Sequence, residues 1–120
     1  MTTIDIAKDF LQLASSGKVE EAYLNYVSTD FIHHNQYFQG SREALKKAMA
    51  EAHETSPNKR IEIKQCFTDD NTVITHSLVV KENMEMAVVH IFRFHGDTIV
   101  ELWDLGQIIA KESPNENGLF

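Results

Sequence analysis

The fold of this chain is decided by residues 87–107, AVVHIFRFHGDTIVELWDLGQ. Both halves of this stretch are largely apolar, and a Gly-Asp pair at 96–97 is a typical turn, so the stretch predicts two antiparallel strands joined by a hairpin. Two polar side chains, His90 and Asp104, stand among the apolar residues. Because a buried polar group costs free energy unless it is hydrogen-bonded, we expect these two side chains to be paired or to do chemistry.

The residues before this hairpin continue the strand pattern. Apolar runs at 61–67, 72–80 and 84–94 are separated by turn residues at 69–71 and 81–83, which predicts an antiparallel meander. Several strands are apolar at both alternating positions, so we expect both faces of the sheet to be covered. Helices would cover one face, and a second copy of the chain, forming a homodimer, would cover the other.

The first half of the chain has helical periodicity. Residues 4–15, 19–26 and 44–52 place apolar side chains three and four positions apart, and residues 31–35 form a short extended segment. Three helices followed by an antiparallel sheet predict an α+β fold with its helices on one face.

Length and composition restrict the class of protein. A chain of 120 residues that is 42% hydrophobic and 24% charged predicts one domain, residues 1–120, with a modest core. The net charge is −7 and the basic residues are scattered, which argues against nucleic acid. Cys66 is the only cysteine, so no internal disulfide is expected. The N-terminal residues 1–14 predict a helix rather than a targeting or membrane segment, and we expect a cytoplasmic location.

The turn leaves the register of the hairpin open. A two-residue turn would place His90 opposite Trp103, whereas a bulge or a three-residue loop would place it opposite Asp104. If the pair meets, His90 orients Asp104, and an apolar pocket raises the pKa of the carboxyl toward a range useful for moving a proton between carbon and oxygen. The alternative is a polar pair that only fixes the strand register.

Other polar and aromatic side chains are candidates for binding a substrate. An amide such as that of Asn35, or one of the two imidazoles before it, can hold a carbonyl or enolate oxygen. His76 lies on an apolar strand and is either a hydrogen-bonded core or interface residue or part of the pocket, and Trp103 either walls a ligand or packs the sheet. No local metal-binding spacing is present, so we expect no metal. The candidate substrate-binding residues are Asn35, His34, His76 and Trp103.

Four segments together resemble a known family. Residues 31–35 (FIHHN), 91–93 (IFR), 99–104 (IVELWD) with Gln107, and 115–120 (NENGLF) are similar to the SnoaL-like group of the nuclear-transport-factor-2-like superfamily. The resemblance implies a cone-shaped curved sheet wrapped around a pocket, roofed by helices and commonly dimeric. It also implies polyketide cyclase chemistry, in which an Asp acts as general acid/base in an aldol condensation without metal or cofactor. In this chain Asp104 would be that acid/base, His90 its partner and Asn35 a polar group of the pocket.

The sequence leaves three functions open. In the first, Asp104 removes a proton next to the carbonyl of a small hydrophobic compound, and a ring closure or isomerisation follows. In the second, the same fold is a small-ligand-binding or dimerisation module, and His90 with Asp104 is only structural. The third, epoxide hydrolysis, would need Arg93 to point inward, but its position in the strand alternation is opposite to that of His90.

Overall fold

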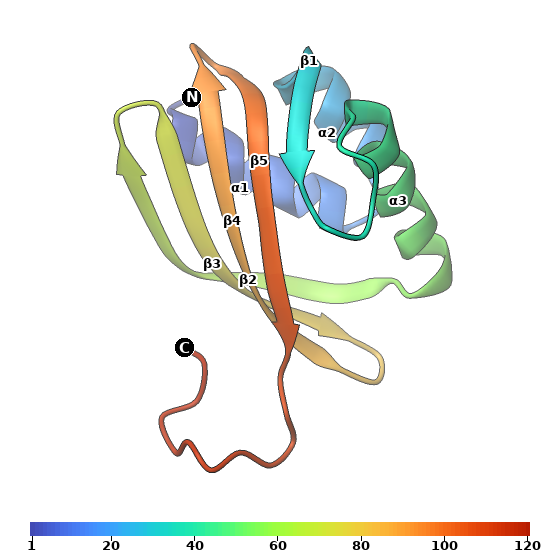
Figure 1. Cartoon of the computed structure of the whole chain (residues 1–120), viewed down its shortest axis with the longest axis vertical. Coiled ribbons are helices and arrows are strands. Elements are labelled where there is room, and N and C mark those ends of the chain that lie inside the picture. Colours follow the sequence, from blue (N-terminus) through green and yellow to red (C-terminus); the bar gives the residue numbers. More distant parts are fainter.

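The structure, a computed structural model, describes residues 1–120 and confirms the predicted α+β fold (Figure 1). Three helices and the first strand precede a four-strand meander, as the sequence pattern indicates. The elements in chain order are α1 (Thr3–Ser15), α2 (Val19–Tyr26), β1 (Val27–His34), α3 (Arg42–Thr55), β2 (Asn58–Asp69), β3 (Thr72–Lys81), β4 (Glu85–His95) and β5 (Thr98–Ile108).

The helices begin where their caps require and bury one face. Thr2 and Asp5 form a reciprocal capping box at the start of α1, and the side chain of Ser41 accepts a hydrogen bond from Ala44 at the start of α3. The buried face of α1, which includes Phe10, packs onto the sheet. None of the three helices combines the length and the apolar character that a membrane span needs.

The five strands form one sheet in the order β1-β5-β4-β3-β2. Strands β2 to β5 are the predicted antiparallel meander, while β1 pairs in parallel with β5 at the edge, a pairing that no local sequence pattern indicates. Two irregularities in β2, around Lys59 and Lys64, interrupt its pairing with β3. Because bulges bend a strand and increase its twist, β2 sweeps across beneath the helices in a long curve (Figure 1).

Alternation along the strands divides the sheet into two faces. The inner face lies against the helices and carries the core, with Val73 on β3, Phe92 on β4 and Leu102 on β5 all fully buried. The outer face carries partly exposed apolar side chains instead, among them Phe67, Ile74 and Leu105. The face toward the helices is therefore the one that encloses a site.

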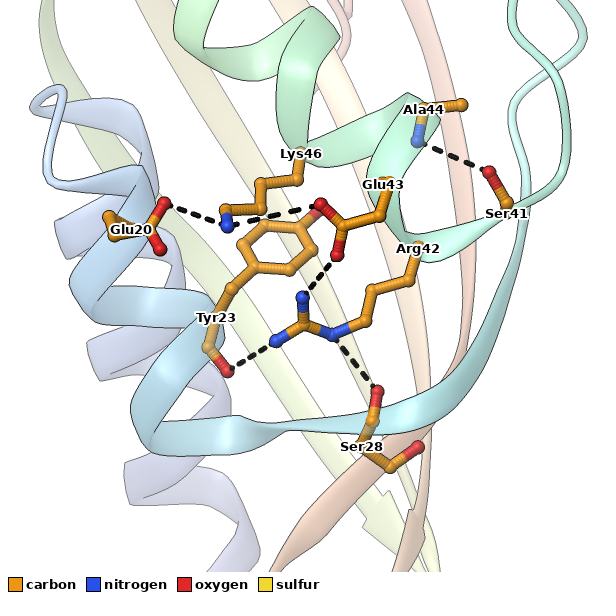
Figure 2. Close-up of polar contacts among 8 residues, drawn as sticks. All are labelled: Glu20, Tyr23, Ser28, Ser41, Arg42, Glu43, Ala44 and Lys46. Carbon is orange, nitrogen blue, oxygen red and sulfur yellow. Dashed lines mark hydrogen bonds and ion pairs between the residues drawn. The ribbon is translucent and has the colours of Figure 1, made fainter.

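Arg42 fixes α3 to α2 and β1 (Figure 2). Its guanidinium donates hydrogen bonds to the backbone carbonyls of Ser28, at 3.1 Å, and Tyr23, at 3.3 Å, and lies 5.3 Å from the centre of the Tyr23 ring. Lys46 adds an ion pair of 2.7 Å with Glu20. These contacts hold α3 in position as one wall of the space above the sheet.

Candidate functional site

A bulge in β5 brings His90 and Asp104 together. Arg93 pairs with Glu101 but Phe94 pairs with Ile99, so the residue between those two on β5 has no partner. As a result His90 lies directly opposite Asp104, and its Nε2 lies 3.1 Å from Asp104 Oδ1. Of the two registers that the sequence left open, the structure has the one with a bulge.

Asn35 contacts the second oxygen of the Asp104 carboxylate. Its Nδ2 donates a hydrogen bond of 2.8 Å to Asp104 Oδ2, so each carboxylate oxygen accepts one hydrogen bond from a neighbouring element. The loop that carries Asn35 is held by His33, whose Nδ1 accepts from the Asn35 backbone N–H at 3.1 Å and whose Nε2 donates to the Gln39 carbonyl at 2.6 Å. Each carboxylate oxygen keeps a further lone pair free to accept a proton.

The pKa of Asp104 is lowered, and the expectation that the pocket raises it is wrong in sign. Burial does raise this pKa, and it is the largest single influence, but the hydrogen bonds and charge of His90 together with the hydrogen bond from Asn35 outweigh it. Asp104 is therefore an ionised carboxylate at neutral pH, with its side chain 20% exposed.

Asp104 and His90 lie in the wall of an apolar cavity between the helices and the inner face of the sheet. The cavity has a volume of about 180 Å³. Its helical side includes Phe10, Leu11 and Met49, and its sheet side includes Ile61, Val79 and Val88. A small hydrophobic molecule in this space would contact the carboxylate directly.

A second hollow meets the cavity at Asp104. It has a volume of about 480 Å³, and Asp104 and Val88 line both spaces. His34, the last residue of β1, and Asn35 and Tyr37, from the loop after it, line only this second hollow. Asp104 is thus accessible from both spaces.

Three predicted substrate-binding residues, His34, His76 and Trp103, do not line the apolar cavity, although His34 lines the second hollow together with Asp104. Trp103 stacks on His34 at 4.7 Å between ring centres, and His34 Nε2 lies 2.6 Å from Glu101. His76 Nδ1 lies 3.2 Å from Gln65 Nε2, and its ring stacks on Phe120. The placement of Trp103 in the pocket is therefore incorrect, since it alternates with Asp104 along β5.

The structure also shows the orientation of the histidine pair on β1 and of Arg93 on β4. His33 is buried and His34 exposed, so His33 is the imidazole of this pair that faces inward. Arg93 faces outward, as its alternation predicts, and forms an ion pair of 2.7 Å with Glu101. It takes no part in the cavity.

Strand register also places a polar row across the inner face that the sequence analysis did not identify. Cys66, Thr75, His90 and Asp104 are successive partners on β2, β3, β4 and β5. Thr75 Oγ1 and His90 Nδ1 are both buried without a hydrogen-bond partner in the protein. The signal was available, because Thr75 shares its position in the alternation with the core residue Val73. No three His, Cys, Asp or Glu side chains converge as a metal site would require.

Comparison with known proteins identifies the family. The SnoaL-like domain matches residues 7–102, which is most of the chain. The chain belongs to the SnoaL-like domain family. The match ends two residues before Asp104, so it does not itself include the carboxylate. No curated protein matches the chain in sequence.

Solved structures of nuclear-transport-factor-2-like proteins share the fold. An NTF2-like protein of unknown function from Burkholderia xenovorans is similar with a TM-score of 0.75 and 14% identity, over 93% of this chain and 88% of that one. A protein with a ketosteroid isomerase-like fold from Catenulispora acidiphila, in complex with trimethylamine, has a TM-score of 0.70 and 15% identity, over 87% and 86%. An LEH-like epoxide hydrolase from M. tuberculosis has a TM-score of 0.69 and 14% identity, over 88% and 82%. At such identities the likeness establishes the fold alone.

Proposed function

We propose that this SnoaL-like protein is a cofactor-independent general acid/base enzyme that moves a proton on a small hydrophobic carbonyl compound, as an aldol-type cyclase or an isomerase does. The observation that carries this proposal is the ionised carboxylate of Asp104, held by His90 and Asn35 in the wall of an apolar cavity.

The base in this reaction is Asp104. A free lone pair of its carboxylate accepts the proton from the carbon next to the carbonyl, and the electron pair of the broken C–H bond moves to form the enolate. The resulting carboxylic acid gives up its proton readily, because the hydrogen bonds from His90 and Asn35 favour the ionised form. The same group can thus return the proton to oxygen or carbon at the end of the reaction.

The enolate oxygen would lie where the apolar cavity and the second hollow meet. The side-chain amide of Asn35 has two N–H groups, and only one is used by Asp104. The second N–H is the donor that the proposal assigns to the carbonyl oxygen. This role falls to Asn35 rather than to His34, because His34 Nε2 already lies 2.6 Å from Glu101 and its ring stacks on Trp103.

The experiment is hydrogen exchange at carbon. A panel of enolisable hydrophobic ketones is incubated with the protein in D₂O, and incorporation of deuterium next to the carbonyl is followed by NMR. We expect catalysed exchange by the wild type and a loss of at least about 100-fold in Asp104→Asn, since one general base contributes about that much. Exchange that survives unchanged in Asp104→Asn would exclude the mechanism.

The second candidate function is a non-catalytic module that binds a small ligand or dimerises. It is favoured by the hydrogen bonding of Asp104, because a carboxylate with a partner on each oxygen is also what a structural pair looks like. This alternative expects Asp104→Asn to destabilise the fold by about 1 to 3 kcal/mol while no reaction rate changes. Epoxide hydrolysis has no such support, since Arg93 is paired with Glu101 outside the cavity.

We also propose that the outer face of the sheet joins two copies of the chain. Phe67, Ile74 and Leu105 expose 57%, 37% and 53% of their surfaces there, on three different strands. Apolar side chains exposed together on one face of a sheet can mark an interface. A second copy is the proposed occupant, because symmetric pairing of like surfaces is the commonest form of assembly.

A further inference from the structure

Lys81 lines the same cavity as Asp104 but lies at a different end of it. It is the last residue of β3 and shares the inner-face alternation of Val73 and Val79. Thr75, the partner of His90, precedes it by six residues on the strand, which corresponds to about 20 Å along an extended backbone. The Lys81 Nζ donates a hydrogen bond of 2.5 Å to the carbonyl of Ser56, which also lines the cavity.

Lys81 is unusual among the basic residues of the chain. Only Arg42, Lys46 and Lys81 are partly buried, and the first two each have a carboxylate oxygen at 2.7 Å. Lys81 has no carboxylate within 4.0 Å among the ion pairs of the structure. In a chain with 18 acidic residues, a partly buried lysine without a carboxylate partner calls for an explanation.

One explanation is structural, and it accounts for one of the N–H donors of the ammonium. Ser56 is the C-cap of α3, and a lysine that donates to a carbonyl at the end of a helix stabilises its C-terminus. An ammonium has three N–H donors, however, and Ser56 accepts from one. Burial also lowers the pKa of Lys81, so the unpaired charge has a cost that a ligand could offset.

We propose that the cavity takes an amphipathic ligand whose anionic group, a carboxylate, binds Lys81 while its apolar body lies along the cavity toward Asp104. The binding of such a ligand does not depend on the proposed function. Only the statement that this ligand is the substrate rests on it. In that case the substrate is a hydrophobic carbonyl compound that also bears a carboxylate. The charge of Asp104 repels an anion, so the two charged ends of the cavity fix the direction in which such a molecule lies.

The test compares ligands that differ only in charge. Binding of octanoate, 1-octanol and methyl octanoate to the intact protein is measured by titration calorimetry at neutral pH and low salt. We expect octanoate to bind about tenfold more tightly than the two uncharged compounds, as a charge-assisted contact with a partly buried lysine would provide. Equal affinities, or no saturable binding of octanoate at millimolar concentration, would overturn the inference.

Variants locate the contact. Lys81→Met should remove the preference for octanoate, whereas Lys111→Met, which makes the same change of charge on an exposed residue of the C-terminal segment, should retain it. A preference that persists in Lys81→Met would show that the anion binds elsewhere and would overturn the inference. Should Lys81→Met fail to fold after losing its contact with Ser56, the wild-type comparison decides the question.

The outcome is independent of catalysis. Asp104→Asn should bind octanoate at least as tightly as the wild type, because a negative charge is removed from the cavity. A protein that prefers octanoate through Lys81 but catalyses no exchange would retain the anion site and lose the proposed function. A protein that catalyses exchange but does not prefer octanoate would retain the proposed function and lose the anion site.

Discussion

At Asp104, two hydrogen bonds decide the protonation state of a buried acid. His90 and Asn35 favour the carboxylate more than burial disfavours it, so its pKa lies below the ordinary value of 3.8. A lowered pKa in the folded protein stabilises the fold at pH values above 3.8, and this contribution is lost as the pH falls through the folded-state pKa. The pairing thus serves both stability and the availability of a base at neutral pH.

Thr75 provides a second test on a single residue, that of a buried hydroxyl without a hydrogen-bond partner. Its hydroxyl is buried without a partner, so Thr75→Val, which keeps the shape of the side chain, should leave the free energy of unfolding unchanged or raise it by up to about 1 kcal/mol. Urea denaturation measures the difference. The converse change Val73→Thr buries a new hydroxyl on the same strand face and should destabilise the protein. A clear loss of stability in Thr75→Val would mean that the hydroxyl is hydrogen-bonded after all.

Only those site residues that stand out in the local pattern of polar and apolar side chains could be predicted from the sequence. His90 and Asp104 stand out because they are polar residues in apolar strands. Alternation along β5 already separates Trp103 from Asp104, whereas His76 could not be placed in this way, because alternation within one strand does not tell which of its faces meets the helices. His90 and Asn35 together lower the pKa of Asp104, and the approach of Asn35 from the loop after β1 is one that no local pattern indicates.

Among the elements, α3 is joined by Arg42 to both α2 and β1. Arg42→Met keeps much of the aliphatic side chain but removes the hydrogen bonds to Ser28 and Tyr23, and we expect a loss of about 1 to 3 kcal/mol in the free energy of unfolding. The control is Lys47→Met on the same helix, where an exposed pair of 3.9 Å with Glu51 should contribute well under 1 kcal/mol. Equal effects in urea denaturation would contradict this account of how α3 is held.

The bulge in β5 is the element on which the site depends, and the sequence left it open. Gly96 has a positive φ of 61°, which glycine adopts without strain, and the turn falls where the pattern predicts. The turn does not set the register farther along the strands. The inner face sets it, because burying both Ile99 and Leu102 requires one extra residue between them.

For the whole molecule, composition and periodicity were enough to predict the α+β class, since three amphipathic helices and a meander have few other ways to bury their apolar faces. The parallel pairing of β1 with β5 was beyond this reasoning. It joins distant parts of the chain, and it is what brings the Asn35 loop beside Asp104.

The proposed dimer is also a property of the whole molecule. Sedimentation of the wild type should give the mass of two chains, and Leu105→Lys, which places a charge on the outer face, should give that of one. Lys47→Met, on the helical side, serves as the control and should remain dimeric. A wild type that sediments as a single chain at all concentrations would refute the interface.

The most direct test of the account is the titration of the Asp104 carboxyl carbon by ¹³C NMR, with and without 1-octanol in the cavity. We predict that the signal titrates below pH 3.8, so that the group is ionised at neutral pH, and that it shifts when octanol binds. A carboxyl that titrates above this value, or a signal that octanol leaves unchanged, would contradict the claim that Asp104 is an ionised base in the wall of a ligand cavity.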